Sequence, residues 1–212
     1  MEFKELLNTV LVSVNLKEMI TQIGEDEVKK ILSTFECPQN MDVQNFIRDK
    51  AILFSQQGIA RTHLIYWCNR DDPWGENKEL VGYYTITSKS IVVYKNSVSK
   101  TVWKRIIKFG ERDINSKKCV FSALLIGQLG KNYAGGNNCL ISGNELLNLA
   151  LDKIKFIQNE IGGKFTYLEC QDNPKLIKFY EDNGFTRFGK RRLDRDETDI
   201  EGEYLIQLFK YL

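Results

Sequence analysis

The stretch YLECQDNPKLIKFYEDNGF, from Tyr167 to Phe185, decides the fold. An apolar strand is predicted over Phe165 to Cys170, and a helix begins at Asn173-Pro174, because proline suits the first turn of a helix. Gly184 ends that helix, and a second strand follows over Phe185 to Phe188. This order predicts a strand-helix-strand unit within a sheet.

The helix preceding this unit has the clearest pattern in the chain. Its apolar residues form one stripe, and Ser142 and Glu145 have the spacing of a capping box. Gly162-Gly163 ends it. The stripe consists of Leu147, Ala150, Leu151, Ile154, Ile157 and Ile161.

The other predicted elements give a mixed sheet flanked by helices, an α/β fold. Apolar residues recur at helical spacing around Leu16 to Ile23, Val28 to Phe35, Val43 to Phe54 and Ser99 to Phe109. Strands are predicted over Thr62 to Trp67, Leu80 to Thr87, Cys119 to Leu129 and Tyr204 to Tyr211, with a hairpin connection at Asn69 to Asn77 and a charged loop over Lys190 to Glu203.

Composition indicates one globular domain and excludes several classes of protein. The 212 residues are 42% hydrophobic, enough to bury one core. No apolar run reaches the ~18 residues of a membrane span, and the start of the chain carries Glu2 and Glu5 rather than a basic stretch followed by a signal core. We therefore expect a cytoplasmic protein with no membrane partner.

Cysteine and histidine usage favours neither a disulfide framework nor a metal site. The five cysteines include no CxxC pair, so we expect buried thiols and no metal. The one histidine, His63, lies in an apolar segment typical of a strand or core residue. A nucleophilic pair of Cys37 with His63 has no supporting motif.

A glycine-bearing loop after the Cys119 to Leu129 strand leads into the helix that starts near Ser142. Free backbone N–H groups and the helix dipole at such a point favour phosphate groups. The loop contains neither GxGxxG nor GxxxxGK[ST], which disfavours a dinucleotide-binding fold or an NTPase. An ordinary capped helix, with Ser142 and Glu145 satisfying its first turn, is the alternative interpretation.

Three features of the chain together resemble the GNAT (Gcn5-related N-acetyltransferase) superfamily. Asn173, Phe179-Tyr180 and Gly184-Phe185 match the family's helix with a Phe-Tyr pair and the following strand. Leu125 to Leu129 resembles the family's splayed central strand, and Ile141 to Leu151 resembles its loop and pyrophosphate helix. The loop departs from the family signature Arg/Gln-x-x-Gly-x-Gly/Ala, because Asn138 to Gly143 keeps only the last glycine.

A looser resemblance covers the first half, which is similar to the GNAT branch containing the aminoacyl-tRNA-acetylating toxins. It implies a GNAT-like domain over residues 35-212, with residues 1-34 as a helical N-terminal extension packed on it. The residues that carry it are Phe35-Glu36-Cys37, Val43-x-x-Phe46-Ile47-x-x-x-Ala51, Ala60-x-Thr62-x-Leu64-x-Tyr66 and Val81-Gly82-Tyr83-Tyr84.

The resemblance implies acetyl-CoA as co-substrate and Tyr180 as general acid. A phenol with a pKa of ~10 is protonated at neutral pH and can protonate a departing thiolate. Packing on the apolar face of its helix is the alternative role for Tyr180. The implied acetyl-CoA-binding residues are Gln128, Leu129, Gly130, Ile141, Ser142, Gly143, Asn144, Glu145, Asn173 and Phe179.

No residue of the sequence stands out as a general base. An α-amine with a pKa of ~7.7–8.0 is partly neutral at pH 7, so an α-amino acceptor is chemically easier than a lysine. Glu169, at the end of its strand, is placed to polarise a water or to form a hydrogen-bonded surface group.

The segment Lys89 to Lys118 carries nine basic and two acidic residues, a local charge of +7, although the whole chain has a net charge of only +2. Such a segment is either a solvated face or a surface for a phosphate-bearing partner such as tRNA. Three functions therefore stay open: an N-acetyltransferase acting on a primary amine, a toxin acetylating the α-amine of aminoacyl-tRNA, and a non-catalytic CoA-binding regulatory protein. A homodimer is a further open expectation.

Overall fold

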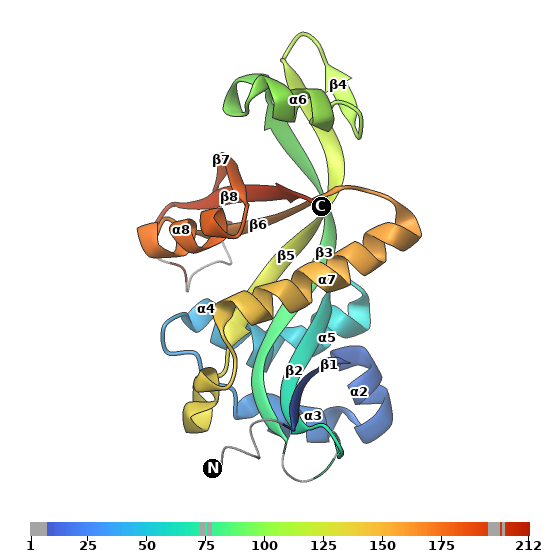
Figure 1. Ribbon diagram of the computed structural model, residues 1–212, viewed down its shortest axis with the longest axis vertical. Helices are drawn as coiled ribbons and strands as arrows, with labels where there is room; N and C mark the ends of the chain where they lie inside the picture. The colour runs from blue at the N-terminus through green and yellow to red at the C-terminus, as the bar shows by residue number, and fades with distance from the viewer. Residues whose placement is uncertain (1–7, 73–74, 76–77, 195–199, 201) are drawn as a thin grey trace. The chain divides into compact units, whose positions relative to one another are not determined.

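The computed structural model describes residues 8–72, 75, 78–194, 200 and 202–212. Figure 1 shows the helices and strands, coloured from the N-terminus to the C-terminus. The elements are β1 (Thr9–Asn15), α2 (Leu16–Ile23), α3 (Glu25–Ser33), α4 (Met41–Asn45), the π-helical turn η1 (Phe46–Lys50), α5 (Ala51–Gln57), β2 (Arg61–Asn69), β3 (Glu79–Tyr94), η2 (Lys95–Ser97), α6 (Lys100–Ile106), β4 (Glu111–Asp113), β5 (Lys118–Lys131), η3 (Ala134–Cys139), α7 (Gly143–Ile161), β6 (Phe165–Gln171), α8 (Pro174–Asp182), β7 (Thr186–Arg192) and β8 (Tyr204–Tyr211).

The strands form one mixed sheet in the order β1-β2-β3-β5-β6-β8-β7, and β4 pairs with β5. β5 and β6 run parallel, while β1 with β2, β6 with β8 and β7 with β8 are antiparallel. A parallel pair needs a long crossover, which η3 and α7 provide here. The predicted α/β fold with a mixed sheet is confirmed.

The described residues group into two compact units, each with its own core. One holds the residues up to Thr85 together with Gln128–Ala150, and the other holds Ile86–Gly127 together with Leu151–Leu212. The core of the first unit is built from α2 to α5 on β2 and β3, around Leu32, Phe35 and Tyr83. The core of the second packs α6 on its strands, around Trp103 and Phe165.

The prediction of a wholly helical N-terminal extension is wrong at residues 9–15, which form β1 and pair with β2. Val10, Val12 and Val14 alternate along this strand and pack against the core of the first unit. β-branched residues at a period of two favour a strand over a helix. The helices predicted beyond it are confirmed as α2 and α3.

Smaller differences concern lengths and short elements. The predicted Val43 to Phe54 helix is realised as α4, η1 and α5 in succession. β7 extends to Arg192, into the predicted charged loop, because its pairing with β8 continues as far as Arg192 opposite Tyr204. Residues 73, 74, 76, 77, 195–199 and 201, within the predicted hairpin connection and the charged loop, lie outside the described residues.

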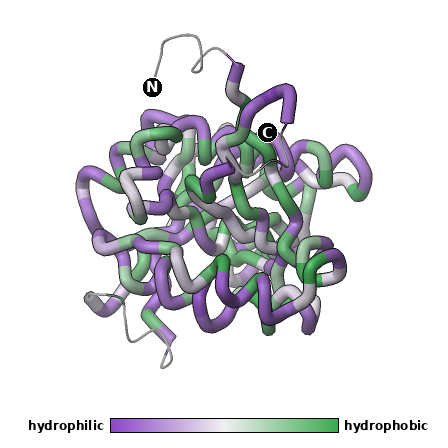
Figure 2. The backbone as a smooth tube through the Cα atoms, turned by 90° about the horizontal axis from the view of Figure 1, so that it is seen from below, coloured by the Kyte–Doolittle hydropathy of each residue, from purple (hydrophilic) through white to green (hydrophobic). Residues whose placement is uncertain are grey.

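Burial agrees with the alternating pattern of the sequence. In Figure 2 the chain changes between hydrophobic and hydrophilic colour over short distances, as amphipathic helices and half-buried strands require. None of the described helices is long and apolar enough to cross a membrane. His63 is buried in β2 and stacks on Tyr84 with 5.0 Å between ring centroids, which supports its interpretation as a core residue.

Candidate active site

The end of β5 carries three of the predicted acetyl-CoA-binding residues. Pairing between β5 and β6 covers Leu124 to Ile126 only, and Gln128, Leu129 and Gly130 follow beyond it. The side chain of Gln128 is bound, because its Nε2 donates a hydrogen bond to Oδ2 of Asp42 over 2.9 Å. This bond ties β5 to α4, in a region that the sequence did not associate with the site.

Gly130 allows a close approach between β5 and the first helices. A Cβ atom built on Gly130 would lie 2.3 Å from Cγ1 of Val43, and one built on Gly82 would lie 2.8 Å from the carbonyl oxygen of Gly130. Because real Cβ atoms do not come so near to other atoms, both positions require glycine. The backbone of Gly130 is therefore held between α4 and β3.

The loop between β5 and α7 is organised by Lys131. Its Nζ donates hydrogen bonds to the carbonyl oxygens of Asn138 (2.9 Å) and Ile141 (3.2 Å). An ammonium group has three donors, and these two bonds leave one for another acceptor. Lys131 is not among the residues predicted from the sequence, although its place directly after Gly130 is a signal that could have found it.

The first turn of α7 is closed by the predicted capping box. Ser142 N donates to Oε2 of Glu145 over 2.8 Å, and Glu145 N donates to Oγ of Ser142 over 3.1 Å. Hydrogen bonding by the Ser142 side chain, followed by its backbone N–H, holds the pKa of the Glu145 carboxyl below its usual range, so the group is ionised at neutral pH. Ile141, at the position of a family glycine, points its side chain into the core and is 2% exposed.

The charges around this loop favour a phosphate-bearing co-substrate, provided that the Glu145 side chain moves. The helix dipole of α7 and the ammonium of Lys131 both favour an anion, and the buried side chain of Ile141 does not occupy the loop surface. The Glu145 carboxylate, in contrast, holds the Ser142 N–H and repels a second anion. A rotation of that one side chain frees the N–H group.

Tyr180 lies on α8 in the second unit and is 7% exposed. Its ring packs edge-on against Phe179 and Phe185, with centroids 5.1 and 5.8 Å away. No hydrogen bond among the described residues involves its hydroxyl, which is also absent from the buried polar atoms without a partner. Burial, followed by the charge of Cys170, raises the pKa of the phenol well above its ordinary value, so Tyr180 holds its proton at neutral pH.

Asn173 forms the N-cap of α8. Its Oδ1 accepts hydrogen bonds from the backbone N–H groups of Lys175 (2.9 Å) and Leu176 (3.3 Å), and Pro174 occupies the first turn. An N-cap of this kind stabilises a helix by about 1 kcal/mol. The geometry thus gives Asn173 a structural role in presenting Phe179 and Tyr180, and its contact with a co-substrate stays a prediction.

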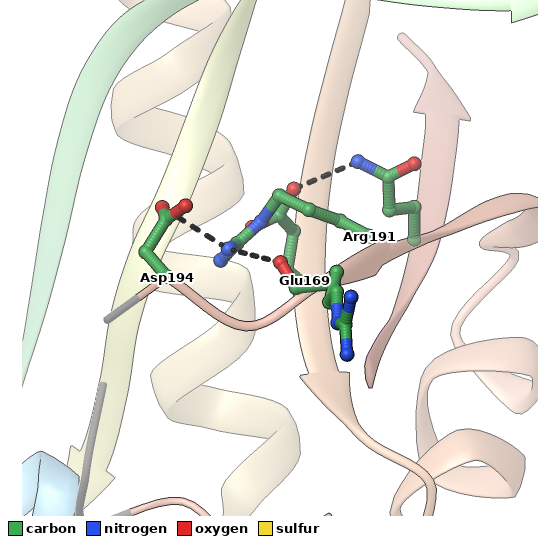
Figure 3. A network of polar contacts seen from close by, with 5 residues as sticks. Glu169, Arg191 and Asp194 are labelled. Atoms are coloured by element: carbon green, nitrogen blue, oxygen red, sulfur yellow. Dashed lines mark hydrogen bonds and ion pairs between the residues drawn. The ribbon is translucent and has the colours of Figure 1, made fainter. Parts of the chain in front are cut away.

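Glu169 belongs to a polar network rather than standing free as a base. Its Oε2 accepts from Nε of Arg191 and its Oε1 accepts from Nε2 of Gln207, both over 2.8 Å. Arg191 also reaches Asp194, as Figure 3 shows. Gly189 makes room for Gln207, since a Cβ there would lie 2.9 Å from Oε1 of Gln207. Of the two interpretations of Glu169, the hydrogen-bonded group is the one found.

The predicted site residues thus fall into two groups. The first unit gathers Gln128, Leu129, Gly130, Ile141, Ser142, Gly143, Asn144 and Glu145 at the end of β5 and the start of α7. The second unit brings Asn173, Phe179 and Tyr180 together on α8.

The cysteines and the acidic residues suggest no other centre in the described part of the chain. All five cysteines are free, and of these only Cys139 is exposed. Burial raises the pKa of the Cys37 thiol, which is unfavourable for a nucleophile. Among the described residues, no group of three His, Cys, Asp or Glu side chains could hold a metal ion.

No protein-family model matches the chain, and no curated protein sequence matches it. Solved structures do resemble it. A bacterial toxin shares 18% identity at a TM-score of 0.60 and covers 95% of this chain and 90% of its own. AtaT complexed with acetyl-methionyl-tRNAfMet shares 15% identity at a TM-score of 0.60, covering 93% of this chain and 94% of its own. A tyrosine-to-phenylalanine mutant of KacT shares 15% identity at a TM-score of 0.58, with the same coverage. The chain therefore shares the fold of these solved structures, in agreement with the GNAT-like fold expected from the sequence.

Proposed function

We propose that this protein is an N-acetyltransferase that transfers the acetyl group of acetyl-CoA to a primary amine by direct attack on the thioester. The observation that carries the proposal is Tyr180, a buried tyrosine whose hydroxyl has no hydrogen-bond partner among the described residues and keeps its proton. The fold supports it, since other proteins of this fold were crystallised with acetyl-CoA.

The proposed reaction needs three contributions from the chain. The neutral amine forms a bond to the acetyl carbon while the bond from that carbon to sulfur breaks. The nitrogen then loses one proton to water, and water returns a proton to Tyr180 after the acid step. Backbone N–H groups near Leu129 and Gly130 stabilise the negative charge that develops on the carbonyl oxygen. Tyr180 gives its proton to the leaving thiolate. Lys131 and the first turn of α7 would hold the pyrophosphate of the co-substrate.

The experiment that tests this function is incubation of the purified protein with acetyl-CoA and a panel of primary amines, with thiol release and product mass as readouts. Turnover above background supports the enzyme and removes the alternative of a non-catalytic CoA-binding regulator. Failure both to bind acetyl-CoA by calorimetry and to consume it would end the proposal.

The Glu145 carboxylate should weaken binding of the co-substrate. Glu145→Gln keeps the capping box, because a glutamine side chain also accepts a hydrogen bond from the Ser142 N–H, but it removes the negative charge. We expect the variant to bind CoA about threefold more tightly by calorimetry, with the free energy of unfolding unchanged within ~0.5 kcal/mol.

Lys131→Met is the opposite change at the same loop and should weaken CoA binding, while Lys131→Arg should retain most of the affinity. If Glu145→Gln binds CoA no better than the original protein, the carboxylate does not compete for this position.

A second candidate function, acetylation of the α-amine of aminoacyl-tRNA by a toxin, is favoured by the basic segment Lys89 to Lys118. Eight of its nine basic residues are exposed, and none of them forms an ion pair with a described residue. Cations without acidic partners are available to phosphates. AtaT, which has the same fold, was solved with acetyl-methionyl-tRNAfMet. Growth arrest on expression, lost with Tyr180→Phe, would support a toxin.

Charge removal on α6 tests the role of the basic segment. The double variant Lys100→Gln, Lys104→Gln removes two exposed cations without touching the core. If the segment binds tRNA phosphates, the variant should bind all tRNAs more weakly, whatever their sequence. The magnitude of the slope of log affinity against log salt concentration should fall by about 1.5. The matched control is Lys29→Gln, Lys30→Gln on α3, whose lysines are already paired with acidic residues. Equal salt slopes for all three proteins would exclude α6 from the contact.

A further inference from the structure

Asp42 is a partly buried carboxylate whose hydrogen-bond partner is neutral. It lies in the first turn of α4, and its Oδ2 accepts from the amide nitrogen of Gln128 over 2.9 Å. Glu169, the comparable carboxylate of the second unit, is instead held by Arg191. Among the ion pairs of the described residues, none includes Asp42.

The position of Asp42 beside the end of β5 is fixed by its neighbour Val43. The carbonyl oxygen of Val43 accepts a 2.6 Å hydrogen bond from the hydroxyl of Tyr83, and its N–H donates to the side chain of Asn40. The side chain of Val43 lies directly on Gly130. These contacts fix α4 on Gly130, and the hydrogen bond from the side chain of Gln128 keeps Asp42 near the end of β5.

The charge of Asp42 acts on the buried phenol of Tyr83. Together with burial, which is the larger cause, it raises the pKa of the Tyr83 phenol. A carboxylate has about four sites for hydrogen-bond donors, and Gln128 fills one of them. A cationic donor would add an ion-pair attraction to this partly buried carboxylate, which the neutral amide of Gln128 does not supply.

We infer that Asp42 binds the ammonium group of the acceptor, with Gln128 as the positioning residue that orients the carboxylate. The inference rests on the proposed function, which puts the reacting carbonyl at Leu129 and Gly130. It narrows the acceptor class to a primary amine that arrives as a cation, has no carboxylate beside the amine, and gives up one proton to water before its nitrogen attacks. A free carboxylate next to that amine would be repelled by Asp42.

Calorimetry with leucinamide as the probe, in the presence of CoA, tests this assignment. The protein, Asp42→Asn and Asp49→Asn are compared, since Asp49 is an exposed carboxylate in the same helical stretch. We expect Asp42→Asn to weaken leucinamide binding about tenfold and Asp49→Asn to leave it within twofold. N-acetylleucinamide, which carries no ammonium group, should bind all three proteins equally. The affinity for CoA should not change.

Turnover of leucinamide separates this inference from the proposed function. A role in acceptor binding predicts that Asp42→Asn raises KM about tenfold and leaves kcat within threefold. Binding that depends on Asp42 without any turnover would refute the acetyltransferase and keep the ammonium site. No binding of leucinamide, or equal binding by Asp42→Asn, would overturn the assignment of Asp42.

Discussion

Tyr180→Phe is expected to lower kcat/KM about a hundredfold or more and to leave the fold unchanged. The loss follows from removing a general acid, which contributes a factor of about 10² to 10⁴. The fold should persist because the ring keeps its contacts with Phe179 and Phe185, and the hydroxyl gives up no hydrogen bond to a described residue. Thiol release under saturating acetyl-CoA measures the first effect, and denaturant unfolding measures the second.

Tyr167→Phe is the matched control for this experiment. Tyr167 is also a buried tyrosine of the second unit, 4% exposed, and burial likewise raises the pKa of its phenol. We expect Tyr167→Phe to retain at least a third of the activity. If Tyr180→Phe and Tyr167→Phe retain equal activity, Tyr180 only packs, and the second interpretation given to it from the sequence is the correct one.

The sequence predicted those elements whose signals are local. The apolar stripe of α7, its capping box and the Asn173-Pro174 start of α8 each depend on residues within a few positions of one another. The capping box and the start of α8 are present as expected, and the stripe is buried from Leu147 to Ile154, whereas Ile161 at its end is exposed. β1 was missed despite its alternating valines, because the helical pattern directly after it dominated the interpretation of the N-terminal segment.

The contacts around the candidate site could not be predicted, because they join distant parts of the chain. The hydrogen bond between Asp42 and Gln128 spans 86 positions, and Val43 meets Gly130 over a similar separation. The hydrophobic periodicity of a sequence reports local structure and does not indicate which distant residues pair. Lys131 differs from these residues, because its hydrogen bonds to Asn138 and Ile141 are local. A prediction that the loop folds back on Lys131 would have been enough to find them.

Gly130→Ala should destabilise the protein by about 2 kcal/mol, the usual cost of overpacking a core. The backbone of Gly130 does not have a positive φ, so alanine is not strained there and the cost comes from the contact with Cγ1 of Val43. Gly127→Ala on the same strand is the control. A Cβ at Gly127 meets no atom within 4 Å, and the smaller entropy of the unfolded chain makes this change neutral or slightly stabilising.

A double-mutant cycle with Val43→Ala assigns the cost to that contact. Val43→Ala leaves a cavity that the new methyl group at residue 130 fills in part, so the double variant should be at least 1 kcal/mol more stable than the sum of the two single changes predicts. Additive free energies of unfolding would mean that α4 does not rest on Gly130. Asp42 would then lose the neighbour that holds it beside β5, so the same cycle also examines the geometry on which acceptor binding depends.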